Sequence, residues 1–182
     1  MTARRMTHAR YRRSWLAFAA WLVAGIACAG APAMSPGTGD GWVDAVMVDI
    51  DRYAARYPDA FVDELARYHG APRQLVAELL ADGRWTAGDV YFACALGQYA
   101  GQPCRSVVAA RDRDRTRDWS VVARDLGVAP GSDAFQRIKR AIVRSYERWA
   151  RPLLVDASLH AEFPKYDVAP ASAPPSATRD RR

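Results

Sequence analysis

Apolar side chains recur every three to four residues along most of the chain after residue 41, which is the spacing of amphipathic α-helices. No segment shows the sustained alternation of apolar and polar residues that marks a half-buried strand. The first stripe consists of Val43, Met47, Ile50, Ala54 and Tyr57, and the last consists of Phe135, Ile138, Ile142, Tyr146 and Trp149. The pattern predicts an all-α domain.

Glycine and proline residues divide this region into short helices. Gly70 and Pro72 give a stop signal followed by a start signal, and Gly101 and Pro103 repeat this pair 31 residues later. We interpret each repeat as the turn between two paired helices. The expected fold is therefore a compact bundle of about six short helices, built from helix–turn–helix hairpins over residues 42–163.

The two flanks of this region have a different composition. Residues 34–41 are rich in glycine, proline, serine and threonine and are expected to form a flexible lead-in. Residues 164–182 are rich in proline, alanine and serine and end in Arg-Asp-Arg-Arg. This composition predicts a disordered tail.

The N-terminus resembles an export signal in its composition. Its first thirteen residues are rich in arginine and carry no acid, and an apolar run of 17 residues follows from Trp15 to Ala31. Small residues after this run offer cleavage sites. A charged start, a short apolar stretch and a small-residue exit are typical of a secretory signal peptide, which we place at residues 1–33. The protein is then expected in the periplasm or outside the cell.

Two alternatives to simple cleavage remain at this N-terminus. The apolar run could stay as an uncleaved membrane anchor, although it is short for the ~30 Å of a bilayer core. Cys28 could carry a lipid, although Gly25 stands where lipoprotein signals have leucine or a similar residue. The pair Arg12 and Arg13 also fits a twin-arginine signal, so the sequence leaves the export route open.

Net charge gives little information about partners once the signal is set aside. The whole chain carries +6, but five arginines precede Met34, and without them 21 basic residues face 20 acidic ones. Charge is divided along the rest: residues 34–102 carry 5 basic and 10 acidic side chains, and residues 103–182 carry 16 and 10. Global basicity therefore does not indicate a nucleic-acid partner.

One local feature of the basic half is a candidate binding surface. Five arginines follow helical spacing beside the apolar face of the last predicted helix: Arg137, Arg140, Arg144, Arg148 and Arg151. This arginine stripe could meet an acidic protein or an anionic membrane surface. The alternatives are a solvated face, or pairing with the acidic first half of the same domain.

The usual signatures of catalysis and metal binding are missing from the sequence. Only His69 and His160 follow the signal, and His69 is expected at a helix end, where its imidazole could meet the last carbonyls. No metal-ligand spacing and no Gly-x-Ser-x-Gly motif is present, so we predict no catalytic residue, no metal site and no cofactor. Asp49 and Asp51 are two apart, point to different sides of a helix and are expected to be solvated.

Cys94 and Cys104 are a candidate disulfide. Two thiols in one small exported domain tend to pair in an oxidising compartment. The geometry is less favourable, because about six helical residues, or ~9 Å of rise, separate Cys94 from the following turn. Two small buried residues are the alternative.

Two resemblances complete the analysis. The segment from Trp119 to Gly127, before a basic helix, resembles the start of a DNA-binding helix-turn-helix. The motifs Trp85-x2-Gly-Asp-Val-Tyr91, Trp119-x2-Val-Ala-x2-Leu-Gly127 and Pro130-Gly-Ser-x2-Phe135 resemble a family of uncharacterised exported bacterial α-helical proteins. That family has no established activity, so the second likeness implies export and fold only.

These observations favour an exported, non-enzymatic binding or structural module of unknown ligand. A helix-turn-helix-like nucleic-acid-binding protein is the first alternative, although export would separate the domain from chromosomal DNA. A small envelope enzyme is the second alternative.

Overall fold

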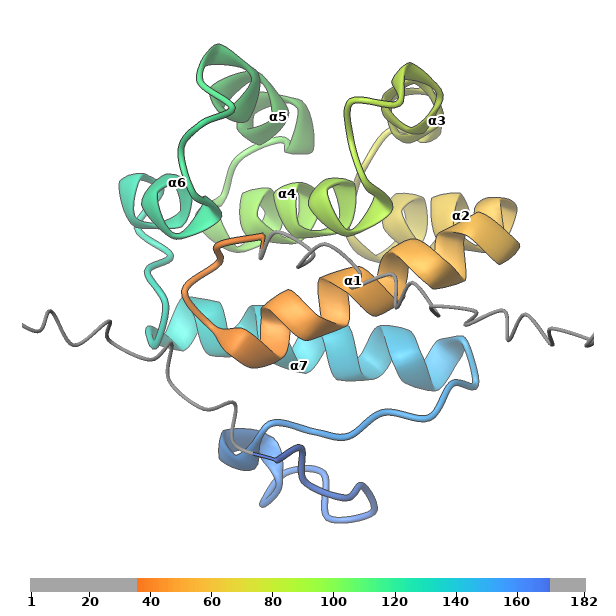
Figure 1. The fold of residues 1–182 in the computed structure, drawn as a ribbon, viewed down its shortest axis with the longest axis vertical. Helices are drawn as coiled ribbons and strands as arrows, with labels where there is room; N and C mark the ends of the chain where they lie inside the picture. Colours follow the sequence, from red (N-terminus) through yellow and green to blue (C-terminus); the bar gives the residue numbers. More distant parts are fainter. Residues whose placement is uncertain (1–35, 171–182) are drawn as a thin grey trace, which may run out of the picture. The chain divides into compact units, whose positions relative to one another are not determined.

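The structure is a computed structural model that describes residues 36–170 (Figure 1). Within them lie seven α-helices and a short 3-10 helix at Ala157–Leu159. The α-helices are α1 (Gly41–Arg56), α2 (Pro58–Tyr68), α3 (Arg73–Asp82), α4 (Ala87–Ala100), α5 (Cys104–Arg113), α6 (Trp119–Asp125) and α7 (Asp133–Arg148). The only β-type pairing among the described residues is one isolated bridge between Val155 and Val168.

The all-α prediction is confirmed, with one helix more than expected. The expected signal peptide, Cys28 and residues 171–182 lie outside the described residues.

Helix α4 is the centre of the fold. Helices α1, α3, α5 and α7 all pack against it, with α3 and α5 on one side and α1 and α7 on the other (Figure 1). Its residues from Val90 to Leu96 have no exposed surface. A helix that is apolar on every side is stable only where neighbours cover its whole circumference, which explains the central position of α4.

Local capping signals position the ends of the longest helices. The Thr86 hydroxyl accepts a hydrogen bond from the Asp89 amide at the start of α4, and the Ser132 hydroxyl accepts one from the Phe135 amide at the start of α7. Each bond satisfies a backbone donor that the first helical turn leaves unpaired, a contribution of about 1 kcal/mol.

The ordered domain is longer at both ends than the sequence predicts. Thr38, in the expected flexible lead-in, is fully buried, and its hydroxyl donates to the Asp44 carboxylate at 2.6 Å. Past the expected boundary at 163, the Ala169 amide donates to the Val155 carbonyl at 2.8 Å. Composition predicted looseness at both ends, but specific hydrogen bonds tie these residues to the domain.

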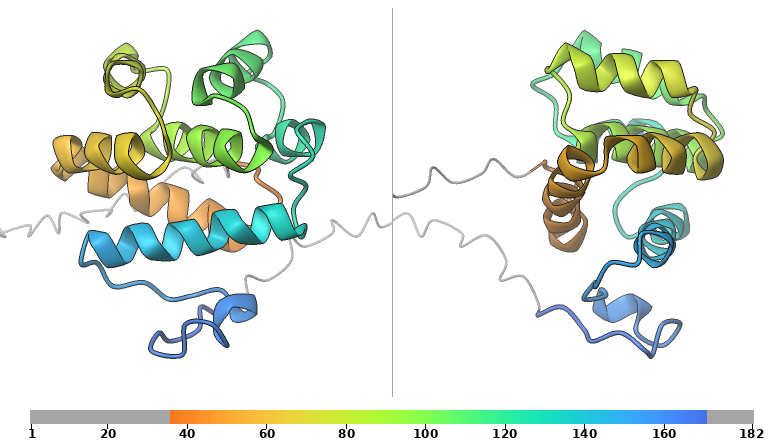
Figure 2. Two further views of the ribbon diagram at one scale, coloured as in Figure 1. Left: turned by 180° about the vertical axis from the view of Figure 1, so that it is seen from behind. Right: turned by 90° about the vertical axis from the view of Figure 1, so that its right-hand side faces the viewer.

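Residues 151–170, named here the C-terminal segment, lie on the side of α7 that faces away from α4 (Figure 2). Val155, Leu159 and Phe163 are its buried anchors. The segment therefore covers a face of α7 that an isolated helical hairpin would leave open.

Candidate functional site

The predicted arginine stripe does not form a free cationic surface. Arg140 pairs with Glu162, and Arg144 lies 3.7 Å from Glu147. The other two ion pairs join Arg148 to Glu64 of α2 and Arg151 to Asp49 of α1. Only Arg137 makes no ion pair within the described part of the chain; its guanidinium lies 6.0 Å from the Tyr99 ring centre. Of the alternatives raised by the sequence, pairing within the domain describes four of the five.

The C-terminal segment also occupies the face by which α7 would enter a nucleic-acid groove. Glu162 takes up Arg140, the Phe163 ring lies 5.5 Å from the Arg144 guanidinium, and Lys165 pairs with Glu147 at 2.9 Å. A recognition helix needs this face free to reach base edges. The segment therefore covers part of this face of α7, where the Arg140 and Arg144 side chains remain 42% and 58% exposed.

Cys94 and Cys104 are joined in a disulfide, with their Cα atoms 4.3 Å apart. The helical rise overestimated their separation because the chain after α4 turns back along it instead of leading away. Gly97 makes this return possible: a Cβ at Gly97 would come within 2.8 Å of the Gln102 carbonyl oxygen. The bond ties α5 to the central helix.

The motif Trp85-x2-Gly-Asp-Val-Tyr91, together with Trp119 of the following motif, holds α4 to its neighbours. The Trp119 indole donates to the Asp89 carboxylate at 2.6 Å, and the Trp85 and Trp119 rings lie 6.2 Å apart. A Cβ at Gly88 would stand 2.5 Å from the Met47 carbonyl oxygen, so only glycine lets α1 and α4 approach this closely. These motif residues have structural roles and do not form a site.

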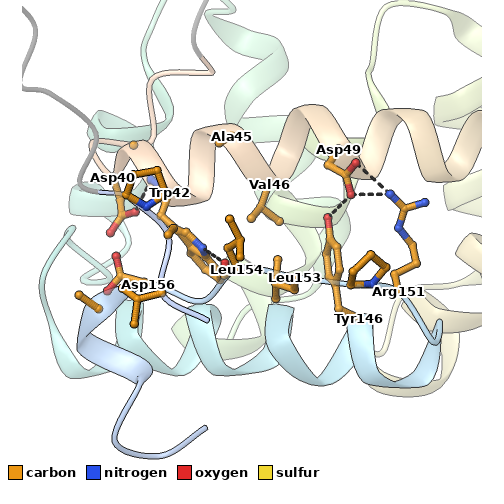
Figure 3. Close-up of a pocket in the computed structure, with 16 residues that line it drawn as sticks. Asp40, Trp42, Ala45, Val46, Asp49, Tyr146, Arg151, Leu153, Leu154 and Asp156 are labelled. Atoms are coloured by element: carbon orange, nitrogen blue, oxygen red, sulfur yellow. Dashed lines mark hydrogen bonds and ion pairs between the residues drawn. The ribbon is translucent and has the colours of Figure 1, made fainter. Parts of the chain in front are cut away.

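Between α1 and the C-terminal segment lies a groove with a volume of about 860 Å³ (Figure 3). We name it the α1 groove. Side chains of Trp42, Ala45 and Val46 line it from α1, and Leu153 and Leu154 line it from the segment. Its middle is therefore apolar, and its volume is typical of small-ligand sites.

One end of the α1 groove is built on a buried lysine. The Lys139 ammonium, with 3% of its side chain exposed, lies 2.7 Å from the Asp40 carboxylate and 3.0 Å from that of Asp156. Asp40 also accepts the amides of Trp42 and Val43 and so caps α1. Lys139 thus fastens α7 to the first turn of α1 and to the C-terminal segment, and two carboxylates face one cation.

The other end carries a three-membered network. The Tyr146 hydroxyl donates to Asp49 at 2.7 Å, and the Arg151 guanidinium donates to both oxygens of the same carboxylate at 2.8 and 2.9 Å (Figure 3). Burial, followed by the hydrogen bond to Asp49, raises the pKa of Tyr146. The expectation of a solvated Asp49 was wrong, because the chain reversal after α7 brings Arg151 to it. Asp51 likewise has a partner, the Gly88 amide at 2.7 Å.

A second polar cluster lies inside the bundle. The Ser145 hydroxyl donates to Glu64 at 2.6 Å and lies 2.8 Å from the Tyr91 hydroxyl, while Arg148 forms a two-pronged pair with Glu64. These residue types occur in acid–base chemistry, but Tyr91 and Ser145 have no exposed surface. The cluster therefore joins α2, α4 and α7 and gives a substrate no access.

His69 borders this cluster and differs from its expected role. Its imidazole is buried against the Tyr91 ring, with ring centres 4.8 Å apart, and its one polar neighbour of note is the Gln98 side chain, which favours the protonated form. Burial lowers the pKa of His69 to about 4, although Glu64 acts in the opposite direction. The imidazole therefore does not donate to the last carbonyls of α2, which was its expected role.

Two negative findings apply to residues 36–170. They contain no group of three or more histidine, cysteine, aspartate or glutamate side chains placed to hold a metal ion. None of their helices has the length and apolar character needed to cross a bilayer. The apolar run from Trp15 to Ala31 lies outside these residues.

The sequence reasoning missed the α1 groove because its walls come from residues about 100 positions apart. One signal was available: Lys139 stands four residues after Phe135 and three before Ile142, at the spacing of the buried face. A lysine on an apolar stripe indicates a buried cation with an acidic partner.

Comparison with known proteins identified no relative: no family model, no curated protein and no solved structure matches this chain. The functional argument therefore rests on the chain's own geometry.

Proposed function

We propose that this chain is an exported, non-enzymatic binding module whose ligand occupies the α1 groove. The observation that carries the proposal is that apolar residues line the middle of the groove and charged residues stand at its two ends. Its middle is apolar, while each of its four ionisable end groups, Asp40, Asp49, Arg151 and Asp156, already has a partner within the domain. Such a groove offers a ligand mainly shape and apolar surface, while the ion pairs at its ends also hold its walls in place.

Export is supported by the N-terminal composition. The Arg-rich start, the apolar run and the small-residue exit form a secretory pattern. The Cys94–Cys104 bond is consistent with this, because disulfides persist mainly outside the reducing cytoplasm. Neither observation depends on the groove, so export and binding are tested separately.

A filled groove tests the binding function. Ala45 is exposed and lines the groove, so Ala45→Phe places a ring in the space a ligand would take, at a stability cost of within about 0.5 kcal/mol. Ala55→Phe is the matched control, because Ala55 is also exposed on α1 but lines a second cavity of about 480 Å³ instead of the α1 groove. The probe is Nile red, a neutral apolar dye, added to the purified full chain.

We expect Nile red fluorescence to rise with wild type and with Ala55→Phe, and to rise less with Ala45→Phe. Each variant fills a different cavity, so a loss of fluorescence confined to Ala45→Phe reports the α1 groove. Equal fluorescence for all three would refute ligand binding in the α1 groove.

A further inference from the structure

The wall of the α1 groove that the C-terminal segment supplies has the character of an unpaired strand edge. At Val155 this segment already pairs as a strand does: its amide donates to the Asp167 carbonyl at 2.9 Å, and its carbonyl accepts from the Ala169 amide. One residue earlier, the Leu154 carbonyl accepts the Trp42 indole at 2.8 Å. The amides of Leu153 and Leu154 make no hydrogen bond within the described part of the chain.

Leu154 lines the groove and its carbonyl accepts from Trp42 of α1. Its amide, which makes no hydrogen bond within the described residues, is therefore a donor beside the groove. A buried or half-buried amide without a partner is a donor that an incoming carbonyl can satisfy. Extended peptides bind by adding to such edges, with affinity from main-chain hydrogen bonds.

Exposed apolar side chains gather along the same groove. The described part has four large hydrophobic residues with substantial exposure, and two of them, Leu154 (49%) and Val168 (40%), line it. From Asp40 to Asp49 the groove follows nine residues of α1, about 14 Å at the helical rise. An extended peptide covers that length with about four residues.

Charge sets the direction in which a peptide would lie. At one end, the Asp40 and Asp156 carboxylates face the single Lys139 ammonium, which leaves a net charge of −1. At the other end, Asp49 pairs with Arg151 and lies 4.0 Å from Arg52, so that end carries no net negative charge. The first end therefore favours a cation over an anion.

We propose that the ligand of the α1 groove is an extended apolar peptide whose cationic side chain or amino terminus meets Asp40 and Asp156. This proposal rests on the binding function proposed above and names its ligand class. The peptide lies between α1 and the C-terminal segment, fills the apolar middle with alternate side chains, and places a backbone carbonyl on the Leu154 amide.

Three synthetic peptides test each part of the proposal by calorimetric titration of the full chain. The first is acetyl-Ala-Leu-Ala-Leu-Ala-Lys-amide. The second replaces lysine by glutamate, and the third keeps lysine but carries thioamides in place of the alanine and leucine amides, because a thiocarbonyl is a weaker hydrogen-bond acceptor than a carbonyl. We expect the lysine peptide to bind about tenfold more tightly than the glutamate peptide at low salt, with a smaller ratio at 0.5 M salt, because salt screens the attraction. The thioamide peptide should bind more weakly than its parent, because the Leu154 amide then meets a weaker acceptor.

Two variants locate the binding site. Ala45→Phe should abolish binding of the lysine peptide, and Ala55→Phe should preserve it. Asp156→Asn should reduce the preference for lysine over glutamate, because Lys139 keeps Asp40 as its partner and the net charge of this end falls to zero. Loss of binding with Ala55→Phe alone would place the peptide elsewhere and overturn the proposal. So would equal affinity for the lysine and glutamate peptides.

The peptide experiment and the dye experiment test different claims, so either one can fail while the other succeeds. If Nile red binds in an Ala45-dependent manner but no peptide does, the groove binds an apolar ligand and the peptide proposal is wrong. If neither probe distinguishes Ala45→Phe from wild type, the proposed function fails together with the ligand class.

Discussion

Lys139 holds together three parts of the chain that are distant in sequence. Its ammonium joins α7 to Asp40 at the start of α1 and to Asp156 in the C-terminal segment, with almost none of its side chain exposed. A buried pair contributes little net stability against a well-packed apolar substitute, but removing one partner leaves uncompensated charge behind. The two carboxylates, which are 19% and 24% exposed, would then lie side by side.

We therefore expect Lys139→Met to lower the free energy of unfolding by about 2–4 kcal/mol. Lys165→Met is the matched control, because Lys165 is 65% exposed in its pair with Glu147 and its loss should cost less than about 1 kcal/mol. Urea denaturation of both variants gives the comparison. A Lys139→Met variant as stable as Lys165→Met would show that this buried lysine is not a structural tie.

His69 makes stability depend on pH. Its pKa is about 4 in the folded chain and 6.5 as a free side chain, so between these values the unfolded chain binds more protons. Stability is then complete above pH 6.5 and falls as the pH drops toward 4, by about 3 kcal/mol in total. The charged groups nearby are Glu64, which favours protonation, and Arg148, which opposes it.

Replacing this imidazole with an uncharged ring should flatten the profile. We expect His69→Phe to lose less stability than wild type between pH 6.5 and 4, measured by urea denaturation across that range. His160→Phe is the control at an exposed position and should follow the wild-type slope. If His69→Phe and wild type lose stability in parallel, the acid sensitivity comes from other groups.

At the scale of elements, local signals predicted the helices well. The turn signals at Gly70 and Gly101 and the cap at Ser132 act within a few residues, and each lies at a helix boundary in the structure. Periodicity predicted the buried face of α7 for the same reason. These features depend on neighbours in sequence, which a single sequence displays in full.

Contacts between elements that are distant in sequence could not be predicted from such local signals. The α1 groove is formed by residues 40–49 and by the C-terminal segment, whose path depends on a turn at Ala150, where φ is +52°. No sequence signal marks that turn, since glycine is the usual residue there. The same limit explains the solvated role expected for Asp49: its partner Arg151 lies 102 residues away.

The α4–α5 hairpin gives a prediction at this scale. Its disulfide closes a loop with a sequence separation of 10, and in the chain-entropy description such a bond stabilises the folded state by about 3 kcal/mol. A reductant should therefore lower the melting temperature of wild type. The double variant Cys94→Ala and Cys104→Ala is the control and should melt at the same temperature with and without reductant. Thiols that react with maleimide in unfolded, unreduced protein would contradict the bond.

At the scale of the whole molecule, the described domain provides its own partners for most of its charge. Four arginines of the stripe pair with acids of the same domain, and the C-terminal segment packs on the outer side of α7. The groove along α1 is then a feature of the described residues that has the dimensions of a ligand site. Its biological use depends on the compartment the chain reaches, which the N-terminal residues determine.

Export predicts both a shortened chain and an oxidised cysteine pair. Produced in a Gram-negative bacterium, the protein should be recovered outside the cytoplasm with its first residue between Ala29 and Ser35, as intact mass measures directly. Leu22→Asp is the control: a charge inside the apolar run should block export and leave a full-length chain in the cytoplasm, where Cys94 and Cys104 stay reduced.

Exchanging Arg12 and Arg13 for lysine keeps the charge, so loss of export in that variant alone indicates the twin-arginine route. A full-length wild-type chain in the cytoplasm would refute export, and a diacylglyceryl adduct on Cys28 would make the protein a lipoprotein. The α1 groove would keep its geometry in either case, but the peptides available to it would be those of a different compartment.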